Sequence, residues 1–159
     1  MDGISAPAFF NRLKNGCIHD YVLYLGEGFN LYDSSTIDIL ETYLNKYHSG
    51  AGFGAVYSDS VIMIDGNAVC PQFKPAYDIR MKNHGFVFNV PFAVKAKNST
   101  MPIFNEDISK LYLWDGLLNL SSSYLLFQIP RTLFTIDNAF SVLDVAEDIQ
   151  NVKKHYFKS

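Results

Sequence analysis

The residues that could do chemistry in this sequence are few and widely spaced. Its histidines, His19, His48, His84 and His155, form no His-x-x-x-His pair and no mixed spacing with carboxylates that would suit a metal ion. Each is therefore expected to be a surface residue or a hydrogen-bonded core residue. The run Ser121-Ser122-Ser123 lacks the flanking glycines of a nucleophile elbow, so we expect it to form the polar end of a helix.

Cysteines and most glycines give no stronger signal. Cys17 and Cys70 are far apart and match no metal-ligand spacing, which predicts two reduced thiols. The glycine-rich stretch at residues 50–54 lacks the lysine of a phosphate-binding loop. Gly26-Glu27-Gly28 is different, because two glycines around a carboxylate allow unusual backbone angles and the close approach of a ligand or another strand.

Composition narrows the function classes. The 159 residues suit one domain over residues 1–159, and 48% of them are apolar, so the chain can bury a core. The net charge is −3 and the cations are scattered, which argues against nucleic acid as a partner. The N-terminal residues do not resemble a signal peptide, and no stretch approaches the roughly 20 apolar residues that span a bilayer. We expect a soluble, cytoplasmic protein without a membrane span.

Apolar periodicity predicts helices and strands in alternation. One helix is predicted over residues 5–15, capped by Ser5, and another over residues 35–47. The stretch from His19 to Leu25 is apolar on both faces, which predicts a central strand of a covered sheet. This strand is expected to lie parallel to one at residues 55–58, with the second helix joining them.

The rest of the chain continues the same pattern. A strand at residues 54–64 leads into Asp65-Gly66, a strong hairpin signal, and a return strand near residues 68–70. The remaining segments are β-rich stretches at 86–96 and 125–136, the latter interrupted by Pro130, and amphipathic helices at 107–120 and 138–156. The predicted fold class is therefore α/β.

Several short motifs follow one another along the chain. They are Val56-Tyr57-Ser58-Asp59, Asp65-Gly66-Asn67, the segment Phe73-Lys74-Pro75-Ala76-Tyr77-Asp78, Phe104-Asn105-Glu106 and the segment Ile129-Pro130-Arg131-Thr132-Leu133-Phe134. By their order and spacing, the chain resembles a family 2 glycosyltransferase. The resemblance implies a GT-A fold, with a mixed, mostly parallel sheet between helices and a sugar nucleotide at the strand ends. It also implies a substrate-binding role for Asp59.

The resemblance also marks where this chain departs from the family. The first βαβ unit, which holds the nucleotide base, has no counterpart before Met1. The metal-binding Asp-x-Asp aligns with Gly26-Glu27-Gly28, although a hard cation such as Mn²⁺ or Mg²⁺ needs carboxylate oxygens. Glu27 is the candidate metal ligand from a neighbouring position, and a solvated turn carboxylate is the alternative.

The catalytic base of the family falls on Leu113, which cannot accept a proton. A second acid of the family falls on Asp115. Asp115 is therefore the candidate catalytic residue if the register of the helix slips, and a polar-face aspartate is the alternative.

Two functions from different classes remain open. One is a glycosyltransferase-like protein whose ancestral reaction moves a sugar from a nucleotide diphosphate to a hydroxyl acceptor, with a nucleotide sugar or a glycan as partner. The other is a catalytically silent binding or assembly module, favoured by the missing unit and the replaced acids. A homodimer contact through the last helix is a further hypothesis, and the alternative is that its apolar stripe covers the domain's own sheet. The stripe comprises Val142, Val145, Ile149, Val152 and Tyr156.

Overall fold

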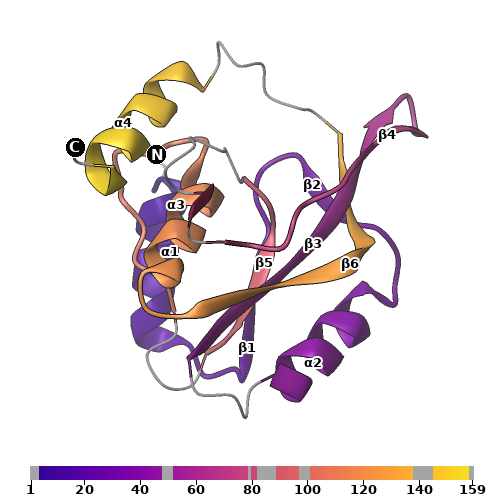
Figure 1. Ribbon diagram of the computed structural model, residues 1–159, viewed down its shortest axis with the longest axis horizontal. Coiled ribbons are helices and arrows are strands. Elements are labelled where there is room, and N and C mark those ends of the chain that lie inside the picture. Colours follow the sequence, from indigo (N-terminus) through magenta and orange to yellow (C-terminus); the bar gives the residue numbers. More distant parts are fainter. Residues whose placement is uncertain are drawn as a thin grey trace.

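A curled mixed sheet flanked by helices forms the body of the protein (Figure 1). The computed structural model describes residues 4–47, 52–78, 80–81, 89–96, 101–137 and 145–157. The strands are β1 (Tyr21–Tyr24), β2 (Phe29–Leu31), β3 (Phe53–Ile64), β4 (Asn67–Gln72), β5 (Phe92–Lys95) and β6 (Leu125–Ile136). Their order is β1-β5-β3-β6-β2, with β4 pairing with the distal part of β3.

The position of β1 corrects the sequence-based prediction. β1 lies at an edge of the sheet rather than at its centre, and it pairs in antiparallel fashion with β5. Because β5 is also antiparallel to β3, β1 and β3 run in the same direction with β5 between them. The pairing is mixed but not mostly parallel, since β3 with β6 is the one parallel pair among the described strands.

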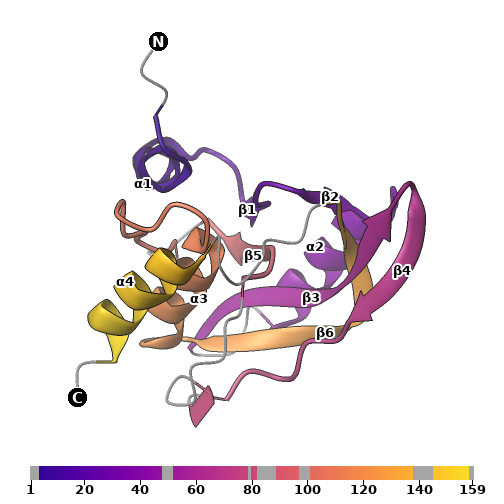
Figure 2. The same ribbon diagram turned by 90° about the horizontal axis from the view of Figure 1, so that it is seen from above.

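The hairpin between β3 and β4 follows from its turn residues. Asp65 has φ 51° and Gly66 has φ 77°, so both lie in the left-handed region that a two-residue type I′ turn requires. This confirms the hairpin predicted from Asp-Gly. A register shift between Ile62 and Met63 accompanies it, and the hairpin projects from the body of the sheet (Figure 2).

Pro130 does not interrupt β6, contrary to the predicted break. Ser58 of β3 pairs with Ile129, whereas the next residue, Asp59, pairs with Thr132. The shift leaves Pro130 and Arg131 in a bulge, where the missing proline N–H costs no ladder hydrogen bond. β6 therefore stays continuous and parallel to β3 on both sides of the bulge.

The helices are α1 (Ala6–Gly16), α2 (Thr36–Tyr47), α3 (Tyr112–Ser121) and α4 (Ala146–Tyr156). Ser5 caps α1 as predicted, because its side-chain oxygen accepts from the Ala8 N–H at 3.4 Å. α3 begins later than the predicted residue 107, and α4 begins at residue 146 with positions 138–144 outside the described residues. None of the helices in the described ranges is long and apolar enough to cross a membrane.

Side chains on β1 alternate between the two faces of the sheet. Tyr21 and Leu23 line a small apolar cavity with α2, whereas Tyr24 stacks among aromatic rings on the other face. There it meets Phe10 of α1 at 5.1 Å and Phe92 of β5 at 4.8 Å between ring centroids. Helices cover both faces, so an edge strand here carries the two-sided apolar pattern that is typical of a central strand.

The apolar stripe of α4 packs on the protein's own core. Val145 and Val152 are buried, and Ile149 and Tyr156 are partly buried against the core cluster. Val142 lies outside the described residues. The described residues of the stripe therefore pack on the domain itself, and a homodimer contact through α4 stays a hypothesis.

Tyr24 gives a first test of the packing. Its hydroxyl is fully buried without a hydrogen-bond partner among the described residues, so Tyr24→Phe removes an unsatisfied polar group. We expect the free energy of unfolding to rise by up to about 1 kcal/mol. Tyr57→Phe is the matched control, because the Tyr57 hydroxyl donates to the Pro75 carbonyl at 2.7 Å, and its loss should destabilise by about 1 kcal/mol. Urea unfolding measures both, and equal destabilisation by the two variants would contradict the packing of Tyr24.

Candidate functional site

The turn after β1 meets the start of α3. A methyl group built at Gly26 would lie 2.7 Å from Cδ1 of Leu113, far inside van der Waals contact, and 3.3 Å from the Tyr112 hydroxyl. Leu113 is fully buried. The leucine side chain therefore occupies the space that any side chain at position 26 would need.

Glu27, the residue after Gly26, is exposed at the edge of this contact. Its backbone N–H donates to the Tyr112 hydroxyl at 3.1 Å, which fixes the turn to α3. Burial raises the pKa of Tyr112, and the hydrogen bond from Glu27 opposes that shift. Gly28, with φ 78°, completes the turn in the left-handed region.

These residues do not fit a divalent cation. Gly26 and Gly28 supply no carboxylate, and Glu27 alone gives one side-chain ligand where Mn²⁺ or Mg²⁺ takes several oxygens. Within the described ranges, no group of three or more His, Cys, Asp or Glu residues could hold a metal ion.

Asp115 lies in the first turn of α3 and is fully buried. Its Oδ2 accepts from the Asn105 N–H at 2.7 Å, while its Oδ1 has no hydrogen-bond partner among the described residues. Desolvation raises the pKa of this carboxyl, against the lowering effects of the Asn105 N–H, the Tyr156 hydroxyl and the nearby His155. In this position the carboxyl holds the segment before α3 and is not open to an acceptor hydroxyl.

Asp59 lies in the middle of β3 and is 7% exposed. Its Oδ1 accepts from the Lys74 N–H at 2.7 Å and from the Gln128 amide at 3.2 Å. Burial lowers the pKa of Lys74, and the Asp59 charge opposes that effect. Asp59 therefore joins β3, β6 and the segment after β4 in a hydrogen-bond set separate from those of Glu27 and Asp115.

Residues 103–107, here called the α3 entry loop, are held by asparagines from the neighbouring helices. Asn11 of α1 donates to the Phe104 carbonyl and accepts from the Phe104 N–H, both at 2.9 Å. Asn119 of α3 accepts from the Ile103 N–H at 3.0 Å. The loop backbone is thereby fixed at both residues without a strand or a helix of its own.

Asp148 of α4 fixes the residues that follow. It is 5% exposed, and its carboxylate accepts from the N–H groups of Ser109, Lys110 and Leu111, the last at 2.8 Å. The first two donors precede α3, and Leu111 is the N-cap residue of the helix. Sequence analysis did not identify this role of Asp148, because no local signal reveals a partner some forty residues away.

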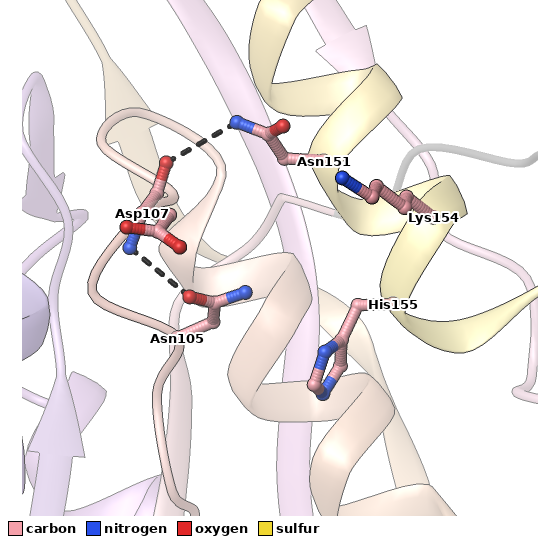
Figure 3. Close-up of a pocket in the computed structure, with 5 residues that line it drawn as sticks. All are labelled: Asn105, Asp107, Asn151, Lys154 and His155. Carbon is pink, nitrogen blue, oxygen red and sulfur yellow. Dashed lines mark hydrogen bonds between the residues drawn. The ribbon is translucent and has the colours of Figure 1, made fainter.

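A polar groove runs between the α3 entry loop and α4 (Figure 3). One cavity of about 250 Å³ is lined by residues from both sides: Asn105, Asp107, Asn151, Lys154 and His155. A second, of about 450 Å³, shares Asn105, Asp107 and His155 and extends to Asn11 and Tyr156. Sequence motifs did not reveal this groove, because its residues come from two segments far apart in the chain.

The contact between Gly26 and Leu113 can be tested by a double-mutant cycle. Gly26→Ala overpacks the contact and should cost about 1–3 kcal/mol of unfolding free energy, whereas Leu113→Ala leaves a cavity and should cost about 2–5 kcal/mol. Together they should cost at least about 1 kcal/mol less than the sum, because the smaller residue makes room for the new methyl group. Gly16→Ala is the control, since nothing lies within 4 Å of a methyl group there, and it should add to Leu113→Ala. Additive costs at position 26 would contradict the contact.

Asp115 should make stability fall with rising pH. The unfolded chain ionises this aspartate near pH 3.9, whereas burial raises its pKa in the folded protein. Between the two pKa values the folded state holds the extra proton, so the unfolding free energy declines as pH rises, and below them the effect vanishes. Relative to Asp115→Asn, the native protein should therefore lose stability from about pH 4 upward. Chemical unfolding across pH checks this, and a difference that grows in favour of the native protein would contradict it.

No protein-family model matches this chain, and no curated protein sequence matches it. The geometry around Gly26, the α3 entry loop and the polar groove therefore carries the functional conclusion.

Proposed function

We propose that this chain is a GT-A-like glycosyltransferase scaffold that does not transfer sugar by itself and serves as a binding or assembly module. The observation that carries the proposal is the packing of Gly26 against Leu113. The family resemblance assigns the metal-binding position to the first and the base to the second. The two positions are 87 residues apart in sequence, yet the Leu113 side chain fills the space that a side chain at position 26 would need.

This one contact bears on both parts of the proposal. A transferase must bring its metal and its base to the same place, so their adjacency supports a common scaffold. Both positions are occupied by residues without a carboxylate, and Leu113 is fully buried. A site filled in this way has neither a base for the acceptor hydroxyl nor oxygens for a cation, which supports the silent module.

The sheet edge gives independent support for the scaffold. No described strand pairs with the outer edge of β1, while helices cover both of its faces. An open edge is where the family's first βαβ unit would add its strands. The described strands end at β1, and this open edge is consistent with a GT-A-like scaffold.

A transferase remains the second candidate because Glu27 places an exposed carboxylate beside the start of α3. In that case Mn²⁺ or Mg²⁺, a nucleotide sugar, a glycan acceptor and the nucleotide-binding unit of the family would be required. The neighbouring glycines and the closed contact at Leu113 favour the silent module.

Titration calorimetry with UDP-glucose and Mn²⁺ separates the two candidates. For the silent module we expect no metal-dependent binding, with any dissociation constant weaker than about 1 mM. Tight binding that needs Mn²⁺ and weakens in Glu27→Gln would instead support the transferase, because an amide is a poorer ligand for a hard cation. Glu147→Gln, an exposed residue of α4, is the charge-matched control.

A further inference from the structure

Internal hydrogen bonds hold both walls of the groove between the α3 entry loop and α4. The side chain of Asn105 accepts from the Asp107 N–H at 3.0 Å, and the backbone of Asn105 donates to buried Asp115. From the opposite wall, the Asn151 amide donates to the Asp107 carbonyl at 3.4 Å. These bonds fix the two asparagine amides and the loop backbone before a ligand arrives, which reduces the ordering cost of binding.

Both walls also carry polar groups that the protein's own hydrogen bonds leave unused. Across the described residues, the Asp107 carboxylate, the Lys154 ammonium group and the His155 ring make no side-chain hydrogen bond. Each asparagine side chain uses one of its two polar atoms, Oδ1 in Asn105 and Nδ2 in Asn151. This leaves Nδ2 of Asn105 as a donor and Oδ1 of Asn151 as an acceptor. Figure 3 shows these side chains arranged around the groove, with those of the loop opposite those of α4.

The charges and polar groups that line the groove favour one class of ligand over others. An anion such as phosphate would be attracted by Lys154 but repelled by the Asp107 carboxylate. A metal ion finds no cluster of three ligating residues in the described chain, and an apolar ligand would leave the lining unsatisfied. Hydroxyl groups both donate and accept, so a ligand with several of them matches this balanced set of donors and acceptors.

We propose that this groove binds a small polyhydroxylated ligand, a saccharide of one or two rings. The cavity of about 250 Å³ is smaller than a drug-sized pocket and suits one ring, and the adjoining cavity of about 450 Å³ gives room for a second. Tyr156 lines the second cavity, and an aromatic ring can pack against the C–H face of a sugar. This inference names a ligand for the proposed binding role and does not depend on the absence of sugar transfer.

Amide NMR titration of the full chain with free glucose and N-acetylglucosamine tests the groove. We expect the signals of Asn105, Asp107 and His155 to shift, with a dissociation constant on the order of 1 mM, because a ligand of about a dozen non-hydrogen atoms gains only modest free energy. Lys154→Ala should weaken binding about tenfold by removing one charged hydrogen bond. Lys153→Ala, which removes the same charge from an exposed position that does not line the groove, should leave it unchanged.

Inorganic phosphate distinguishes the alternative ligand class. The proposal is overturned if neither sugar shifts the groove signals, if phosphate binds there more tightly than both sugars, or if Lys153→Ala and Lys154→Ala have equal effects. Sugar binding at the groove together with Mn²⁺-dependent binding of UDP-glucose at Glu27 would support the groove while contradicting the silent module. The two proposals can therefore fail separately.

Discussion

The close approach of α3 to the sheet is the constraint on which the rest of the structure depends. A methyl group built at Gly116 would lie 2.6 Å from the Phe104 ring and 3.1 Å from the Phe92 ring, so the helix can pack this closely only without a side chain there. Trp114 and the leucines around it are then fully buried. Because α3 has so little room to move, the segments that lead into it must be fixed as well, and buried Asp115 and Asp148 do this through backbone N–H groups.

The same constraint decides what the site can do. At its first turn α3 places Leu113 in the space that a side chain at position 26 would need. At its entry loop the fixed backbone presents unused polar groups toward α4. The packing of α3 thus underlies both proposals, the silent module at Gly26 and Leu113 and the ligand groove beside α4.

Local signals predicted the local structure well. Ser5 caps α1 and Asp65-Gly66 forms the hairpin turn, both as predicted, because capping and left-handed turns depend only on neighbouring atoms. The edge position of β1 was not predictable, since α1 and α2 bury both of its faces and produce the pattern of a central strand. The roles of Asp148 and the groove residues depend on partners distant in sequence, for which a single sequence gives no sign.

The most direct test of the central claim observes the Leu113 methyl groups by NMR while Mn²⁺ and UDP are added. Mn²⁺ is paramagnetic and broadens the signals of nearby nuclei. A closed, apolar contact predicts a nuclear Overhauser effect between a Leu113 methyl group and the Gly26 Hα protons, and no more broadening at Leu113 than at Leu44, which is buried on α2. Selective broadening at Leu113 that requires both Mn²⁺ and UDP would show a working donor site there and would contradict the account.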